Sequence, residues 1–222
     1  MASWMVHLRI ADYLLERLTG IFDTEFVMGN IAPDSGIPNA DWSVFTPSSE
    51  VSHFRTTDEH GLKEVHEDWY IEKYFTGELR SRYDIRQYSF YLGYLTHLLT
   101  DKLWVREIVR PLQIKYQDLF EENPGEWWRR MKKEWHDLDI MYLRENPGFR
   151  AFVLYEGAVG FQNTYLDIFS RDAFDNRREY ITTTYREECE TLECNLRFLS
   201  EEEIAEFVCG SGEEIVKMVS RL

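Results

Sequence analysis

Apolar residues recur at helical spacing along most of the chain. Between residues 3 and 18 they form one stripe, with Ser3 in the position of an N-cap and His7 on the apolar side. Similar patterns, together with their end signals, predict further helices at 23–28, 63–79, 85–120, 123–144, 150–170, 171–194 and 200–221. The pattern therefore predicts an all-α fold.

Helix ends and one long loop organise this pattern. Gly29 is expected to end the second helix, and residues 29–55, rich in Pro, Gly and Ser, are expected to form a long ordered loop. Pro111 should kink or break the longest helix, and Ser200 with Glu203 has the form of a capping box. Because no useful alternation of apolar and polar residues and no repeat occurs, we expect a single domain of roughly seven or eight helices over residues 1–222.

The composition is that of a packed globular protein, and the charge narrows the choice of ligands. Hydrophobic residues make up 44% and aromatic residues 15% of the chain. The formal net charge of −15 disfavours binding to a nucleic-acid duplex or an anionic membrane, since both would repel the protein. A bound metal ion could still attract a phosphate locally.

The cysteines and the N-terminal stretch indicate the cellular compartment in which the protein is expected. Cys189, Cys194 and Cys209 are odd in number and match no metal motif, which indicates free thiols in a reducing compartment. Charged residues interrupt the first apolar stretch, which argues against a signal peptide, and no run of about 18 uncharged apolar residues occurs. We expect a cytoplasmic protein without stable membrane insertion.

His97 and Asp101 are the strongest candidates for chemistry. Their i, i+4 spacing places an imidazole and a carboxylate on one face of an apolar helix. A buried carboxylate is costly unless it is paired or bound to metal, and nitrogen with oxygen ligands suits zinc or another first-row ion. The alternative is a hydrogen-bonded pair that joins two helices.

Three further residues are candidates for the same site. Asp34 follows Pro33 on a stiffened loop, although an Asx-turn would also explain an aspartate there. His53 and His7 lie among apolar neighbours, where a histidine can equally be a satisfied core residue. None of the three identifies a metal site by itself.

A second pair of candidates lies later in the chain. His136 and Asp139 have i, i+3 spacing and could chelate another ion, or they could belong to the solvated end of a charged segment. His60 and His66 lie among acidic residues, and we expect both to be exposed and not to bind metal.

Four short stretches in the first half of the chain carry the five N-terminal candidates. They are Ser-Trp-Met-Val-His7, Gly-Asn-Ile-Ala-Pro-Asp34, Ser-His53-Phe and Tyr-Leu-Gly-Tyr-Leu-Thr-His97-Leu-Leu-Thr-Asp101. In this order they resemble the zinc-dependent phospholipase C family and its single-strand nuclease relatives. The resemblance implies a helical bundle with a three-metal cluster at the bottom of a cleft. It also implies that Asp34, His53, His97 and Asp101 form the first zinc site, while His7 shares Asp101 with another ion.

The chain departs from the family pattern at two places. The family has a histidine ten positions beyond the HxxxD histidine and a later HxxxE pair, whereas this chain has Glu107 there and Ile140 four residues after His136. Glu107, His136 and Asp139 could form an oxygen-richer third site. Secreted members also bind metal through an N-terminal Trp, whereas three residues precede Trp4 here.

The resemblance implies metal-dependent phosphoester hydrolysis with one to three zinc ions, or other divalent first-row ions, as cofactor. A metal-activated water would attack phosphorus, and Asp34 or Asp101 could orient or deprotonate it. The expected substrate is a small phosphoester or a phospholipid-like molecule, and the oligomeric state stays open. The alternative is a non-catalytic, metal-stabilised helical protein that binds a partner and has lost turnover. Candidate lining aromatic residues are Trp42, Phe54, Tyr91 and Trp104.

Overall fold

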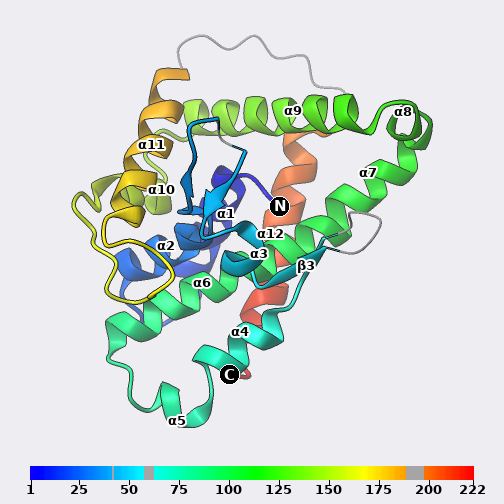
Figure 1. Ribbon diagram of the computed structural model, residues 1–222. Helices are drawn as coiled ribbons and strands as arrows, with labels where there is room; N and C mark the ends of the chain where they lie inside the picture. The colour runs from blue at the N-terminus through cyan, green and yellow to red at the C-terminus, as the bar shows by residue number, and fades with distance from the viewer. Residues whose placement is uncertain (42, 58–62, 189–197) are drawn as a thin grey trace.

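The computed structural model describes residues 1–41, 43–57, 63–188 and 198–222 (Figure 1). Most of these residues are helical, so the prediction of an all-α fold is confirmed; the single-domain organisation stays a prediction. In chain order the helical segments are α1 (Trp4–Leu15), α2 (Asp23–Ile31), a 3-10 turn (Ala32–Asp34), α3 (Ser49–Ser52), α4 (Glu67–Tyr74), α5 (Gly77–Arg80), α6 (Ile85–Trp104), a π-helical segment (Val105–Val109), α7 (Arg110–Lys115), α8 (Gln117–Glu122), α9 (Pro124–Glu145), α10 (Arg150–Gly157), α11 (Ala173–Glu188) and α12 (Glu201–Val219).

Two small antiparallel sheets interrupt the helices, which corrects the expectation of no strands. Strand β1 (Ile37–Pro38) pairs with β2 (Phe45–Thr46), and β3 (Arg55–Thr57) pairs with β4 (Lys63–Val65). Strands of two or three residues are too short to show a period of two in the sequence. The continuous helix predicted over 63–79 is also wrong, because this segment begins as β4 and its helical part is divided into α4 and α5.

Gly29 does not end α2, which continues to Ile31. The helix lies against α6, and a Cβ atom on Gly29 would be only 2.1 Å from the backbone oxygen of Phe90. A close approach of two helix backbones, not a C-cap, therefore requires glycine here. The loop predicted over 29–55 starts later than expected and contains the 3-10 turn, the first sheet and α3.

The long helix predicted over 85–120 is divided near Pro111. Between α6 and α7 lies a π-helical segment in which the Arg110 N–H bonds to the Val105 carbonyl, and Pro111 stands in the first turn of α7. Proline lacks an N–H and crowds the carbonyl four residues before it. The wider π turn relieves this conflict without ending the helical path.

Helix caps follow the sequence closely at some ends and not at others. Ser3 caps α1 by accepting the Val6 N–H, and the capping box of Ser200 and Glu203 at α12 is confirmed. The helix predicted over 150–170 ends at Gly157 instead. The helix predicted over 171–194 begins at Ala173, and its predicted end lies outside the described residues.

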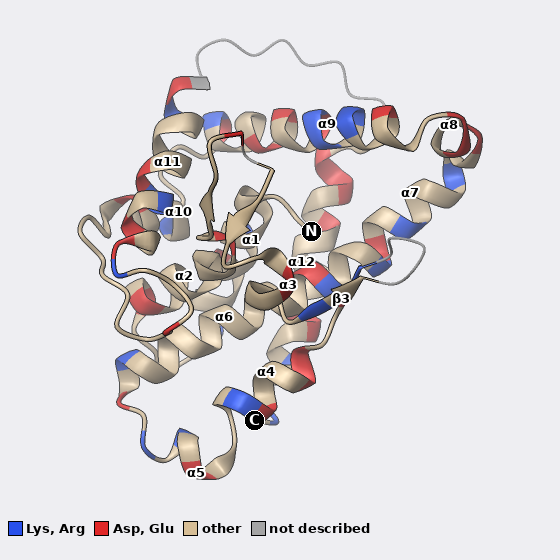
Figure 2. Cartoon of the chain, viewed as in Figure 1, with Lys and Arg blue, Asp and Glu red and all other residues tan. Residues whose placement is uncertain are grey.

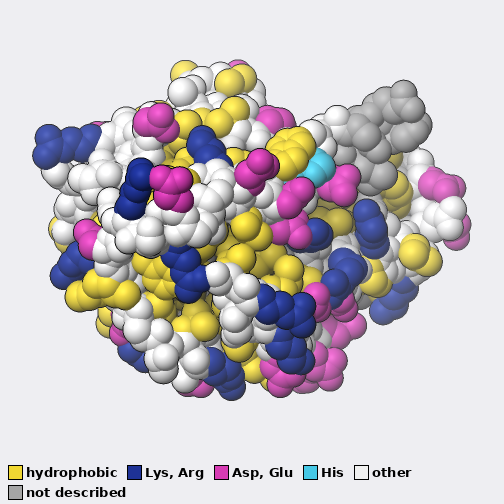
Figure 3. All heavy atoms as spheres, turned by 90° about the horizontal axis from the view of Figure 1, so that it is seen from below, with side chains coloured by type: hydrophobic (Ala, Val, Ile, Leu, Met, Phe, Trp, Pro, Cys, Tyr) yellow, Lys and Arg dark blue, Asp and Glu magenta, His cyan; other side chains and the backbone are white. Residues whose placement is uncertain are grey.

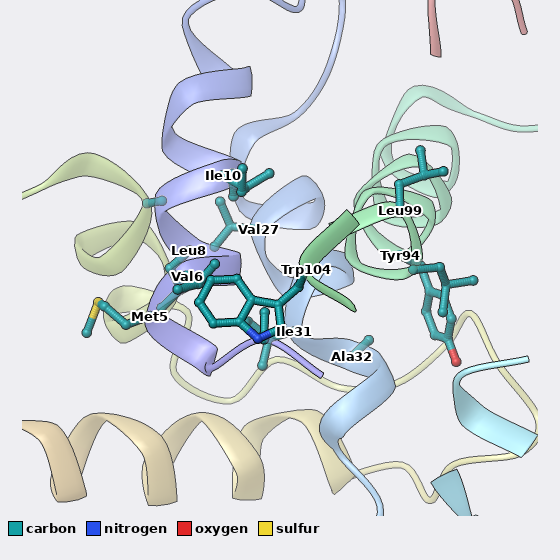
Figure 4. Close-up of a cluster of buried hydrophobic side chains, with 14 of the residues drawn as sticks. Met5, Val6, Leu8, Ile10, Val27, Ile31, Ala32, Tyr94, Leu99 and Trp104 are labelled. Atoms are coloured by element: carbon teal, nitrogen blue, oxygen red, sulfur yellow. The ribbon is translucent and has the colours of Figure 1, made fainter. Parts of the chain in front are cut away.

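The core is built where α1, α2 and α6 pack together (Figure 4). Trp104 from α6 is fully buried there, and it lies among Met5, Val6 and Leu8 of α1 and Val27 and Ile31 of α2. Between Arg86 and Asp101 helix α6 carries no charged residue, as Figure 2 shows by its uniform colour. The site residues of α6 therefore project from an otherwise apolar, buried helix.

The surface carries charges of both signs. On the face shown in Figure 3, hydrophobic side chains reach the surface among Lys, Arg, Asp and Glu. The excess of acidic over basic residues is thus not spread evenly over this face. Within the described part of the chain, no helix has both the length and the apolar character needed to cross a membrane.

Candidate metal centre

Four candidate ligands from three separate segments meet beside α6. His97 and Asp101 project from α6, Asp34 ends the 3-10 turn after α2, and His53 follows α3. His53 Nε2 lies 3.2 Å from Asp34 Oδ1 and 3.9 Å from Asp101 Oδ2, and His97 Nε2 lies 3.8 Å from Asp101 Oδ2. His97 and Asp101 are 0% and 1% exposed, whereas the Asp34 side chain is 13% exposed.

These separations suit one tetrahedral ion. With bonds of about 2.1 Å to nitrogen or oxygen, the ligand atoms of tetrahedral zinc lie about 3.4 Å apart. The observed distances of 3.2–3.9 Å between ligand-type atoms lie near this value. His97 Nε2 and Asp101 Oδ2 are also buried and have no hydrogen-bond partner among the described residues. Buried polar atoms without partners are costly, so their chemistry fits a metal ion.

The orientation of His97 leaves one nitrogen free for a metal. Its Nδ1–H donates to the backbone oxygen of Asn30 at 2.7 Å, which holds the proton on Nδ1 and leaves the lone pair of Nε2 free. Burial, together with the neighbouring His7, lowers the pKa of His97 to about 3, so the ring is neutral at physiological pH. A neutral imidazole held by a second hydrogen bond is the form that binds metal.

His7 extends the cluster on the other side of His97. The two rings stack with centroids 3.7 Å apart and planes inclined by 6°. His7 Nε2 lies 3.4 Å from Asp101 Oδ1, and neither ring nitrogen of His7 has a hydrogen-bond partner among the described residues. The candidate ligands thus form two groups, and within each group the ligand atoms lie within 4.8 Å of one another. One group is His7, His97 and Asp101, and the other is Asp34, His53 and His97.

Neighbouring groups hold these ligands in place. The Ala2 N–H donates to Asp101 Oδ1 at 2.7 Å, and the Ser52 hydroxyl lies 2.9 Å from His53 Nδ1. Without metal, a proton on His53 Nε2 can be donated to Asp34 Oδ1 at 3.2 Å. If Nε2 binds metal, the ring proton would lie on Nδ1 and be donated to Ser52. The Ser-His dipeptide was a usable signal for Ser52, whereas a backbone contact such as that of Ala2 has none in the sequence.

The charge state of Asp34 follows from its neighbours. Burial by itself would raise its pKa, but the hydrogen bond with His53 and the nearby imidazoles hold the pKa of Asp34 well below its ordinary value. Asp34 is therefore an ionised carboxylate at neutral pH. As the most exposed member of its group, it is also the one best placed to meet a ligand from solvent.

Residues 6–104 match the family model described as Zinc dependent phospholipase C. This stretch, which is less than half of the chain, is similar to the zinc-dependent phospholipase C family. The resemblance inferred from the motifs is thereby confirmed, and the family match together with the grouped His and Asp residues supports a zinc phospholipase-like function. No curated protein and no solved structure matches the chain.

The zinc-dependent phospholipase C match contains the five clustered residues and ends before the predicted third site. Glu107 is 49% exposed in the π-helical segment, where it pairs with Arg106 at 2.7 Å. His136 is partly buried, and its ring lies 5.6 Å from that of Tyr185. The structure does not bring Glu107, His136 and Asp139 into a metal-binding group within the described part of the chain.

Asp139 is engaged through both of its oxygens. Oδ1 accepts a hydrogen bond from the Ser3 hydroxyl and Oδ2 accepts one from the Tyr185 hydroxyl, both at 2.7 Å. These bonds join α9 to the start of α1 and to α11. Burial raises the pKa of Asp139 to about 6, although both hydrogen bonds act in the opposite direction.

The raised pKa of Asp139 predicts a pH-dependent stability difference. The folded state binds the proton more tightly than the unfolded chain, so this group's contribution to stability falls as pH rises from about 4 through about 6. Asp139→Asn, which cannot ionise, should gain on the order of 2 kcal/mol in free energy of unfolding relative to wild type between pH 4 and pH 7. Urea unfolding of both proteins at pH 4 and pH 7 measures this gain. If the free energies of unfolding of the two proteins differed by the same amount at both pH values, the raised pKa of Asp139 would be contradicted.

The remaining candidates lie mostly in the core or outside the described residues. The prediction that His66 is exposed is wrong. The residue is partly buried, because its ring stacks on Trp69 and its Nε2 lies 2.8 Å from the Thr56 hydroxyl. Phe54, Tyr91 and Trp104 pack among other aromatic rings. Cys209 is a free, exposed cysteine. His60, Trp42, Cys189 and Cys194 lie outside the described residues.

Proposed function

We propose that this protein is a zinc-dependent phosphoester hydrolase that acts on a small phosphoester or phospholipid-like substrate. The observation that carries the proposal is the set of Asp34, His53, His97 and Asp101, in which all but the partly exposed Asp34 are buried and facing atoms lie 3.2–3.9 Å apart. The unpartnered His97 Nε2 and Asp101 Oδ2 are the strongest members of this set. The match of residues 6–104 to a zinc-dependent phospholipase C family supports zinc as the ion.

The proposed metal ligands are His53, His97, Asp34 and Asp101, with His7 available to a second ion that shares Asp101. When bound, zinc supplies Lewis acidity toward a phosphoryl oxygen and a water of lowered pKa. The number of ions, between one and three, is part of the proposal. The chain's own contribution is to fix the ligands before substrate arrives, which lowers the reorganisation needed during the reaction.

Asp34 is the proposed residue for orienting the attacking water. Its side chain is 13% exposed, while that of Asp101 is 1% exposed and receives the Ala2 N–H. A partly exposed, ionised carboxylate can accept a hydrogen bond from a water and fix its direction of attack. We therefore favour Asp34 over Asp101 for this role, and assign Asp101 to holding metal.

Zinc analysis combined with a phosphodiesterase assay tests the proposal. The purified protein is expected to contain at least one zinc per chain and to hydrolyse bis(p-nitrophenyl) phosphate, with activity lost on chelation and restored by zinc. Zinc in 100-fold excess over its dissociation constant should stabilise the fold by about 2.7 kcal/mol, seen as a higher melting temperature. A protein that binds no zinc would overturn the proposal. Bound zinc without hydrolysis of any phosphodiester would favour the non-catalytic alternative.

A further inference from the structure

Arg177 in α11 is a buried arginine that has no acidic partner in the described part of the chain. Only 6% of the residue is exposed, and its Nη2 donates to the backbone oxygen of Gly36 at 2.8 Å. Its guanidinium lies 5.6 Å from the ring centre of Trp4 and 5.5 Å from that of Tyr180. No carboxylate among the described residues forms an ion pair with it. A buried charge is costly unless it is paired, so this arginine is a candidate for holding an anion.

The next residue provides a direct comparison. Arg178 is similarly buried, with 8% exposed, but its Nε donates to Asp175 Oδ1 at 2.8 Å and its Nη1 donates to the Glu156 backbone oxygen at 3.2 Å. Adjacent positions on one helix therefore contain one arginine with an internal counter-charge and one without. Burial by itself does not explain why Arg177 has none.

Tyr155 in α10 supplies a second unsatisfied group in the same region. It is 1% exposed, and its hydroxyl has no hydrogen-bond partner among the described residues. Burial raises the pKa of this phenol, the carboxylate of Asp34 raises it further, and the charge of Arg177 lowers it. The phenol is therefore a neutral donor, and both Arg177 and Asp34 lie near enough to act on it electrostatically.

The loop after α2 connects Arg177 to the metal centre. Gly36, which receives the Arg177 hydrogen bond, lies two residues after Asp34, which contacts His53. Tyr180, beside the guanidinium, is 41% exposed, so the aromatic wall around Arg177 reaches the surface. Arg177 is thus bonded to the segment that carries Asp34, and the Tyr155 hydroxyl lies within electrostatic range of both.

We infer that Arg177 and the Tyr155 hydroxyl form an anion subsite beside the metal centre, which holds a non-bridging oxygen of the substrate's phosphate group. The assignment of this anion to a substrate phosphoester rests on the proposed function. A guanidinium makes charge-assisted hydrogen bonds to phosphate, and a neutral phenol adds one more donor. Zinc bound at Asp34 would neutralise one of the carboxylates that act on Tyr155, which favours an anion at the subsite.

Calorimetric titration of inorganic phosphate into the full-length protein tests the subsite, with zinc bound and after chelation. Arg177→Gln and Tyr155→Phe are each expected to weaken phosphate binding by about tenfold or more, whereas the matched control Arg178→Gln binds phosphate as wild type does. Zinc content should be the same in Arg177→Gln and wild type. Tyr155→Phe removes a hydroxyl that has no partner, so it should retain the stability of wild type while losing phosphate affinity.

The outcomes separate this inference from the proposed function. Equal phosphate binding by Arg177→Gln and wild type would overturn the subsite, as would an equal loss in Arg178→Gln or the absence of phosphate binding by wild type in both forms. If the protein binds no zinc but its phosphate affinity still depends on Arg177, the subsite stands and the hydrolase proposal fails. If zinc-dependent hydrolysis is normal in Arg177→Gln and phosphate binding is unchanged, only the subsite fails.

Discussion

Replacing Asp101 with Asn is expected to lower zinc affinity about 100-fold or more and to abolish phosphodiester hydrolysis. The carboxylate faces His7 through Oδ1, at 3.4 Å, and faces His53 and His97 through Oδ2, at 3.9 Å and 3.8 Å. It thus faces candidate ligands on both sides of His97. A neutral amide is a poorer ligand than a carboxylate, and its NH2 group would direct a donor toward the metal position.

The same substitution should leave the metal-free fold intact. The asparagine oxygen can still accept the Ala2 N–H, and Oδ2 has no hydrogen-bond partner to lose among the described residues. Asp137→Asn is the matched control, because Asp137 is also a buried carboxylate but pairs with Lys133 at 2.6 Å. The control should keep zinc and lose some stability. Zinc titration followed by thermal unfolding distinguishes the two variants, and a zinc-dependent rise in melting temperature that persists in Asp101→Asn would contradict the assignment.

The part of the site that lies on one helix could be predicted from the sequence. The four-residue spacing of His97 and Asp101 in an apolar stretch determines that both face the same buried side. The position of His7 on the apolar stripe of α1 follows from the same periodicity. Such local geometry depends only on the helical repeat, and for this reason the prediction was reliable.

The approach of the site residues from distant segments could not be predicted from the local sequence pattern. The approach of Asp34 and His53 to α6 depends on contacts between distant segments, and only the family resemblance grouped them beforehand. The Asn30 carbonyl that orients His97 carries no sequence signal, since every residue has a carbonyl group. The predicted helix end at Gly29 is wrong because glycine at a cap and glycine at a helix crossing look alike in a sequence.

Replacing Gly93 with Ala is expected to destabilise the fold by about 3 kcal/mol or more and to weaken zinc binding with it. A Cβ atom at Gly93 would lie 2.0 Å from the backbone oxygen of Phe26 and 2.9 Å from the backbone nitrogen of Asn30. Both obstacles are backbone atoms of α2, so α2 and α6 must move apart. The Asn30 carbonyl, which accepts the His97 Nδ1–H, would move with α2.

Gly210→Ala is the matched control, because Gly210 also lies within a helix but a Cβ atom there would meet nothing within 4 Å. It should stabilise the protein by about 0.4–1 kcal/mol, since alanine reduces the freedom of the unfolded chain. A loss of stability in Gly93→Ala and a gain in Gly210→Ala would separate the effect of the close contact between α2 and α6 from the general effect of replacing glycine by alanine in a helix. Urea unfolding of both variants, with zinc and after chelation, measures them. If Gly93→Ala were as stable as wild type and bound zinc equally well, the contact between α2 and α6 would not be what positions His97.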